Sequence, residues 1–248
     1  MTDNGLYVYA IVRAEQRVPK GLAGVGSPPL PLRFLVEGRL GAVVSDAPPK
    51  LRARRRDLLA HQDLLLRLTG NGPTLPMRFG TVAPDEAAVR AQLTAAEHSH
   101  LTALERLDGR IEVNVKAFAP SHALAHLVRE DQNIRRLHEA ARRRPGYEAN
   151  LRLGEAVVTA LARRAAEAGR SAVRELTPLA DAVATGPEVP GCVLNTSFLV
   201  GRAAEGRFRV AARDFAEARQ DRVELRLAGP LPCYSFVGAD GPLAGAGV

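Results

Sequence analysis

The chain has 248 residues, of which 46% are hydrophobic, enough for one large domain or two ordinary ones around buried cores. No run approaches the roughly 18 uninterrupted apolar residues of a membrane span, and the first residues lack the basic start of a signal peptide, so we expect a cytoplasmic protein. The net charge of +7 rests on arginine, because Lys20, Lys50 and Lys116 are the only lysines. Such a charge would favour acidic proteins, nucleic acid or anionic surfaces. An Arg- and Ala-rich composition also follows from biased coding, so the charge alone identifies no partner.

The first 108 residues are predicted to form an N-terminal α+β domain. A β-branched and aromatic run at 6–12 predicts a strand, and residues 32–37 and 40–45 predict two more strands joined by a tight turn, which makes a small antiparallel sheet. Apolar residues at helical spacing predict helices over 52–68 and 84–107, with Leu58, His61, Leu65 and Leu68 on the apolar face of the first.

The two helices are joined by 75–82, which cannot be helical. Pro76 lacks a backbone donor and biases Leu75 toward extended geometry, while Gly80 permits backbone angles that other residues resist. We expect a fixed, extended connector in which Arg78 is the only charge.

Residues 109–228 predict a second domain of the modified ferredoxin-like βαββαβ type. Strict alternation at 110–118 predicts a strand with one wet face, carrying Arg110, Glu112, Asn114 and Lys116. A polar, Arg-rich helical insertion follows at about 120–146. The remaining predicted elements are a helix at 147–168 stopped by Gly169, strands at 171–177 and 192–200, a helix at 205–219 and a strand at 222–227, with a loop at 178–191. Residues 229–248 are expected to be an extended C-terminal tail.

Few residues carry recognisable chemistry. Cys192 and Cys233 are expected to be free thiols, since they lie far apart in a chain without a secretion signal. The spacings His98-x-His100 and His122-x3-His126 suit metal ligands, but no carboxylate or cysteine pattern accompanies them, so we predict no metal site and no cofactor. The sequence also has no Walker loop, nucleophile elbow or zinc signature, and we predict that the protein is not an enzyme.

Several segments, taken together and in order, match one family. They are 6–12, His61, 75–82, 109–116, 195–200 and 229–237. On these segments the chain resembles the gas vesicle proteins GvpF and GvpL over essentially its full length. The tail has Cys233 where the usual pattern Gly-Pro-Leu-Pro-Pro-Tyr-Ser-Phe has a second proline. The segments do not separate an F-like from an L-like protein.

The resemblance implies an accessory protein of gas vesicle formation. Such a protein would bind the small, hydrophobic shell protein, and other accessory proteins, as an assembly chaperone or a minor structural component. It implies an N-terminal α+β domain followed by a ferredoxin-like domain, in agreement with the element pattern. It implies no enzymatic activity and no membrane insertion, and it places the protein in the cytoplasm and at the gas vesicle.

Three groups of residues are candidates for partner binding. Met77 and Phe79 beside Arg78 would grip an apolar helix and pair with a carboxylate on it; the alternative, which we favour for the apolar residues, is that they fill the core. Tyr234 and Phe236 would clamp a partner or, more in keeping with a short aromatic tail, pack on their own chain. The run Arg54-Arg55-Arg56 would bind an acidic partner, or would simply be a solvated helix face.

A nucleic-acid-binding or regulatory ferredoxin-like protein is the alternative, suggested by the arginine clusters. It is less favoured because the predicted wet strand face carries no aromatic residues on which bases would stack.

Overall fold

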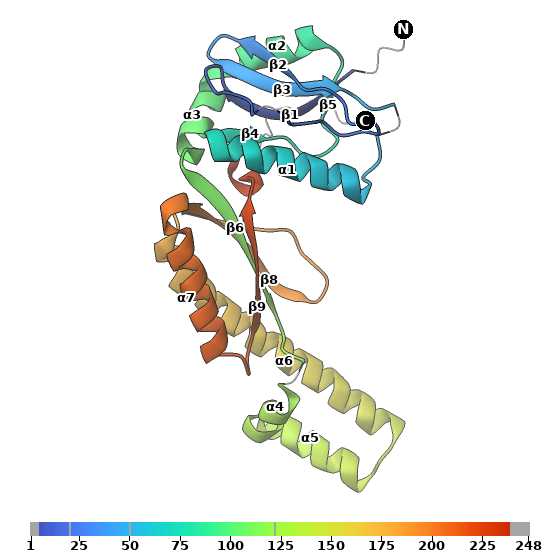
Figure 1. Ribbon diagram of the computed structural model, residues 1–248. Helices are drawn as coiled ribbons and strands as arrows, with labels where there is room; N and C mark the ends of the chain where they lie inside the picture. The colour runs from blue at the N-terminus through green and yellow to red at the C-terminus, as the bar shows by residue number, and fades with distance from the viewer. Residues whose placement is uncertain (1–4, 20, 50, 122, 239–248) are drawn as a thin grey trace. The chain divides into compact units, whose positions relative to one another are not determined.

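The computed structural model describes residues 5–19, 21–49, 51–121 and 123–238, and the chain divides into two units (Figure 1). Unit 1 combines Met1–Glu112 with Pro230–Val248, and unit 2 is Val113–Gly229. Each unit has its own sheet, so the chain is a mixed α/β protein with two antiparallel sheets. In the part of the chain that the structure describes, no helix is both long and apolar enough to cross a bilayer.

Unit 1 is built around one central strand. Its elements are β1 (Leu6–Arg13), β2 (Arg33–Glu37), β3 (Leu40–Asp46), α1 (Arg55–Asn71), β4 (Thr74–Pro76), β5 (Val82–Ala83), α2 (Glu86–Ala95) and α3 (Glu97–Leu107). The strand order is β2-β3-β1-β4, with β5 also paired to β1. Because β4 lies at the edge of the sheet, Pro76 is tolerated there without the loss of an interior ladder bond.

A bulge in β1 decides which side chains reach the core beneath the sheet. The register with β3 shifts between Val8 and Ala10, so one extra residue stands on β1. Tyr7 and Tyr9 therefore share a buried cluster with Ala10 and Val12, which strict alternation along the strand would place on the opposite face.

The helices of unit 1 differ from the prediction at two points. The buried residues of α1 are Asp57, His61, Leu64, Leu65 and Leu68. Leu58, expected on the buried face, is 41% exposed, and its neighbour Leu59 is 54% exposed. The single helix expected over 84–107 is two helices, because Ala96 leaves helical geometry at φ −112° and ψ 15°.

The described part of unit 2 contains a four-stranded sheet and four α-helices, one of which has 30 residues. Its elements are β6 (Arg110–Phe118), α4 (Leu124–Glu130), α5 (Gln132–Arg143), α6 (Tyr147–Leu176), β7 (Ala182–Thr185), β8 (Cys192–Gly201), α7 (Glu205–Ala218) and β9 (Glu224–Leu231), with 3₁₀ turns at Thr177–Leu179 and Arg202–Ala204. The strand order is β7-β8-β6-β9. α4, α5 and the first half of α6 form a separate apolar cluster around Leu127, Ile134 and Ala160.

The prediction that Gly169 stops a helix is wrong. α6 continues through it to Leu176, so the strand expected at 171–177 is helical, and a strand appears instead within the predicted loop, as β7. Gly169 is where the helix lies closest to the sheet: a Cβ there would stand 3.1 Å from the Cβ of Ala117 and 3.5 Å from that of Leu194. The glycine serves close packing rather than termination.

The face of β6 that was expected to be wet is largely covered. Glu112 and Asn114 are buried, at 4% and 9% exposure. The Asn114 amide donates to Asn195 Oδ1 at 2.8 Å and to Ser197 Oγ at 3.1 Å, so polar residues on this face bond to one another instead of to water.

The segment expected to be an extended tail starts inside β9 and then turns. Tyr234–Phe236 form a 3₁₀ turn, and residues 239–248 lie outside the described residues. Ser235 donates from its backbone N to Glu112 Oε2 at 2.9 Å and from Oγ to Oε1 at 2.8 Å, and Arg106 Nη2 donates to the carbonyl of Phe236. The two bonds from Ser235 give both side-chain oxygens of the buried Glu112 a donor.

Candidate partner-binding surface

The turn that carries Arg78 is held to the central strand by backbone bonds on both sides. Met77 N donates to Tyr9 O at 2.9 Å, and Val8 N donates to Thr81 O at 2.9 Å. Within the turn, Thr81 donates to Arg78 O from its backbone N at 3.2 Å and from Oγ1 at 2.8 Å. The backbone on either side of Arg78 is therefore fixed in position.

His61 and Tyr7 bond to the same turn from the core. His61 Nε2 lies 3.0 Å from Met77 O, which can only accept, so Nε2 carries the proton and Nδ1 accepts from the Tyr7 hydroxyl at 3.0 Å. The Tyr7 oxygen in turn accepts from Gly80 N at 3.0 Å. Each polar atom of this buried network thus has a partner.

Burial keeps both side chains of the network neutral. It lowers the pKa of His61, although the bond to Met77 O acts in the opposite direction, and it raises the pKa of the Tyr7 hydroxyl despite the bond from Gly80 N. Phe79 packs edge-on against both rings, with centroids 6.0 Å from Tyr7 and 5.7 Å from His61. The network is a support for the turn, not a site of titration near neutral pH.

The predicted contact residues of the turn separate into core and surface. Met77 is 2% exposed and packs in the core, the alternative favoured above for it, so its side chain is not available to a partner. Phe79 is half-buried against the same cluster. The side chain of Arg78 is exposed and makes no hydrogen bond or ion pair with any described residue.

The N-terminus of α1 collects further exposed arginines. Arg54 is the N-cap residue without a side-chain cap bond, and Arg55 and Arg56 stand in the first turn. Positive charge is unfavourable at this end of a helix, where the dipole is itself positive. Asp57 offsets it only partly: the carboxylate is buried, accepts from Gly26 N at 3.2 Å and lies 3.5 Å from Arg56 Nε.

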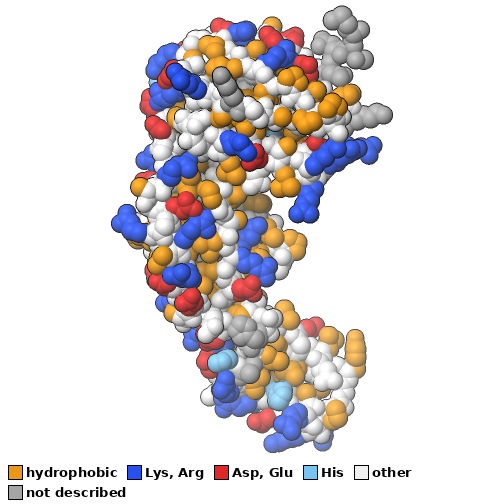
Figure 2. Space-filling model, in the orientation of Figure 1, with side chains coloured by type: hydrophobic (Ala, Val, Ile, Leu, Met, Phe, Trp, Pro, Cys, Tyr) orange, Lys and Arg blue, Asp and Glu red, His pale blue; other side chains and the backbone are white. Residues whose placement is uncertain are grey.

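The segment just before α1 lies beside the turn. A Cβ on Gly80 would stand 3.9 Å from Leu51 Cδ2, and Leu51 packs against the same core cluster as Phe79. We call this the arginine surface; its members are Arg54, Arg55, Arg56, Arg78 and the exposed Leu58 and Leu59. Figure 2 shows basic side chains projecting at the N-terminal end of α1, among apolar ones. Helical periodicity predicts Leu58 on the buried face of this helix, but the structure exposes it together with Leu59.

The aromatic residues of the C-terminal segment pack on unit 1, to which that segment belongs. Phe236 is 7% exposed, and Tyr234 remains 40% exposed. Loss of solvent around its hydroxyl, with Glu112 nearby, raises the pKa of Tyr234 to about 12. Phe236 is thus a core residue of the described structure, whereas Tyr234 keeps an open face.

One group of described residues has the spacing of a metal site, although the fold already occupies its charges. Atoms of His126, Glu130 and Asp221 lie within 4.8 Å of one another. The Glu130 carboxylate, however, pairs with Arg164 and lies 3.9 Å from Arg222. The group is therefore an ion-pair cluster. His122, the other half of the histidine spacing noted in the sequence, lies outside the described residues.

Comparison with known proteins places this geometry in a family. The profile of the family described as "Gas vesicle synthesis protein GvpL/GvpF" matches residues 5–238. The chain belongs to the GvpL/GvpF family. It is 43% identical to gas vesicle protein F of Streptomyces sp. (strain CB03234) over 235 residues, covering 93% of this chain and 98% of that one. It is 35% identical to gas vesicle protein L of the same strain over 263 residues, covering 96% and 94%.

Solved structures of the GvpL/GvpF family share the fold. The crystal structure of GvpF from Anabaena sp. PCC7120 matches with a TM-score of 0.74 at 24% identity, covering 95% of this chain and 98% of that one. GvpF from Microcystis aeruginosa matches with a TM-score of 0.71 at 22% identity, covering 95% and 99%. The family assignment made from short sequence segments is confirmed.

Proposed function

We propose that this GvpL/GvpF protein is an accessory factor of gas vesicle formation that binds the hydrophobic shell protein and assists its assembly, as a chaperone or a minor structural component. The observation that carries the proposal is the arginine surface: exposed arginines and leucines at the start of α1, together with Arg78 on the turn that His61 and Tyr7 hold in place. Family membership supplies the gas vesicle context.

The local electrostatics support a partner at this surface. Arginines at an uncapped helix start break a rule of helix stability, and no described acidic residue pairs with Arg54, Arg55 or Arg78. A partner that carries carboxylates would offset this repulsion. Leu58 and Leu59 would supply the apolar contact area that such ion pairs alone lack at an exposed site.

This arrangement favours an amphipathic helix as the bound element. Apolar residues on one face of that helix would cover the two leucines, while acidic residues at its edge would reach the arginines. Recognition of this kind needs no catalytic group and no cofactor, and we propose a binding role without enzymatic activity.

The nucleic-acid alternative has less support from the same residues. The arginines would suit contacts with the phosphate backbone of a nucleic acid. Base stacking, however, requires exposed aromatic faces, and Phe79 is half-buried against Tyr7 and His61.

We also propose that residues 109–228 are a modified ferredoxin-like domain with α4 and α5 as its insertion. The element order β6, α6, β7, β8, α7, β9 and the strand order β7-β8-β6-β9 support this. The higher identity to the F protein than to the L protein of one strain supports an F-type role, and we expect the protein in the cytoplasm and at the gas vesicle.

Co-expression tests the binding role. The shell protein is produced with and without this chain, and its soluble fraction and its retention on the tagged chain are measured. We expect more soluble shell protein and joint elution. A folded, soluble chain that neither retains the shell protein nor changes its solubility would contradict the proposal.

A further inference from the structure

Three large apolar side chains are exposed along one edge of the first half of α6. Tyr147, Leu151 and Val158 are 83%, 48% and 67% exposed. In Figure 2 apolar side chains gather along this edge of the helix. Nothing in the described chain covers them, although this number of exposed apolar groups in one place is typical of an interaction site.

Their spacing places them on one line. Steps of four and seven residues return to the same side of an α-helix, because seven residues make nearly two turns. Gly154 falls on that line too, and a Cβ there would meet nothing within 4 Å. The opposite side of the same stretch packs on α4 and α5 through Leu153, Ala156, Val157 and Ala160. The fold therefore buries only one of the two apolar faces of this part of α6.

We propose that this line, the α6 seam (Tyr147, Leu151, Gly154 and Val158), is the contact between two copies of this chain. The two helices would run antiparallel about a two-fold axis, as in the commonest class of homodimer. This interface is independent of the arginine surface and does not rest on the function proposed above.

The seam matches itself when one copy is reversed. With the axis beside Gly154, Leu151 faces Val158 of the second copy and Tyr147 faces the half-buried Ala162. The missing side chain of Gly154 falls where the two backbones cross, which permits a close approach. Large residues thus meet smaller ones along the contact.

Charges beside the seam favour the same pairing. One flank alternates in sign along the helix through Glu148, Arg152, Glu155 and Arg163, all exposed. In an antiparallel pair each flank meets the same flank of the other copy, so Glu148 approaches Arg163 and Arg152 approaches Glu155. This charge complementarity is the reason to assign the seam to a second copy and not to a purely hydrophobic partner.

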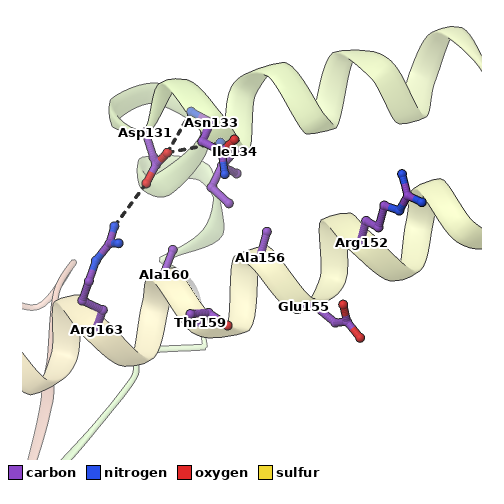
Figure 3. A pocket seen from close by; sticks show the side chains of 9 residues that line it. All are labelled: Asp131, Asn133, Ile134, Arg152, Glu155, Ala156, Thr159, Ala160 and Arg163. Atoms are coloured by element: carbon purple, nitrogen blue, oxygen red, sulfur yellow. Dashed lines mark hydrogen bonds and ion pairs between the residues drawn. The ribbon is translucent and has the colours of Figure 1, made fainter.

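A pocket lies beside this charged flank. Its volume is about 480 Å³ and its lining includes Arg152, Glu155 and Arg163 (Figure 3). Arg163 lies 3.5 Å from Asp131, which also caps α5 through bonds to Asn133 N and Ile134 N. These contacts hold the flank of α6 in place before a second copy arrives.

Analytical ultracentrifugation of the full chain over a range of concentrations tests the seam. We expect a dimer, and Val158→Asp should raise its dissociation constant by at least about tenfold, since the charge would be buried in the contact. Val210→Asp is the matched control: it makes the same change at a valine of α7 that is 46% exposed, and should leave the dimer intact.

Exchanging the charges of Arg152 and Glu155 is a second, independent test of the dimer. Glu155→Arg alone should weaken the dimer, and the double variant Arg152→Glu/Glu155→Arg should restore it, because the reversed pair meets its complement in the other copy. Circular dichroism confirms that each variant is folded. The proposal is overturned if the unsubstituted chain is monomeric at every concentration, or if Val158→Asp dimerises as well as the control. A monomer whose retention of the shell protein depends on Val158 also overturns it and assigns the seam to that protein.

Discussion

At the scale of single residues, His61 is the side chain that fixes the turn carrying Arg78. Replacing it with Phe removes the donor to Met77 O and the acceptor of the Tyr7 O–H, both buried, while the Tyr7 oxygen keeps the bond from Gly80 N. Each such orphaned group costs about 1–3 kcal/mol. We expect His61→Phe to lower the free energy of unfolding by roughly 2–4 kcal/mol, measured by urea titration, whereas an unchanged stability would contradict the network.

The same residue predicts a dependence of stability on pH. The pKa of His61 is lower in the folded chain than in the unfolded one, so the unfolded chain binds the proton more readily. Its contribution to stability is complete above the unfolded pKa, near 6.5, and is lost as the pH falls from there through the folded value.

His61→Gln separates this contribution from others. Glutamine can donate to Met77 O and accept from Tyr7 but does not titrate. The unsubstituted chain should lose stability between pH 7.5 and pH 5.5, by at most about 1.4 kcal/mol per pH unit for each histidine, and the variant should lose less. The remaining loss is expected from His100, whose pKa burial also lowers. Equal slopes in urea titrations of the two proteins would exclude His61 as a source.

The sequence predicted the extended turn, but not all of the contacts that hold it in place. Pro76 and Gly80 predicted the extended connector, and the apolar residues around Arg78 indicated a core. The pairing of His61 with Met77 O and Tyr7 could not be predicted, because it depends on tertiary contacts between residues 16 and 54 positions apart. The exposure of Leu58 was missed because helical periodicity correctly identified the face that His61, Leu65 and Leu68 share, but does not show that the core ends before the first turn of the helix.

At the scale of elements, α6 packs closely against its sheet because Gly169 has no side chain. Gly169→Ala would gain about 1 kcal/mol in helix propensity, but its methyl would stand 3.1 Å from the Cβ of Ala117 on β6, where neither backbone can yield easily. We expect a net loss of about 1 kcal/mol. Gly70→Ala, in the last turn of α1 with nothing within 4 Å, should instead be neutral or stabilising. Thermal unfolding of both variants decides the point, and a stabilised Gly169→Ala would refute the close-packing role.

Elements with strong periodicity were predictable, and their ends were less so. The alternation in β6 and the apolar runs of β1 and β8 predicted strands correctly. Gly169 was read as a stop because a glycine near a helix end is commonly a C-cap, and only the distance to Ala117 reveals its other use. The bulge in β1 places Ala10 and Val12 on the same face as Tyr7 and Tyr9. No local pattern in the sequence predicts this bulge.

At the scale of the whole molecule, the chain offers two exposed surfaces with different chemistry. The arginine surface lies in unit 1 and the α6 seam in unit 2. If the first binds the shell protein and the second joins two copies, charge substitutions in one should leave the behaviour of the other unchanged. Retention of the shell protein by Val158→Asp, measured beside its dimerisation, checks this independence, and loss of both together would contradict it.

The central claim is that the arginine surface binds the shell protein, and the most direct measurement compares retention of that protein on tagged variants of the chain. Arg78→Glu and Arg55→Glu, combined, should reduce retention at least about tenfold, the equivalent of about 1.4 kcal/mol, with an effect that weakens as salt is added. Arg136→Glu makes the same change at an exposed arginine of α5 and should retain as much as the unsubstituted chain. Equal retention by all three folded proteins would contradict the claim.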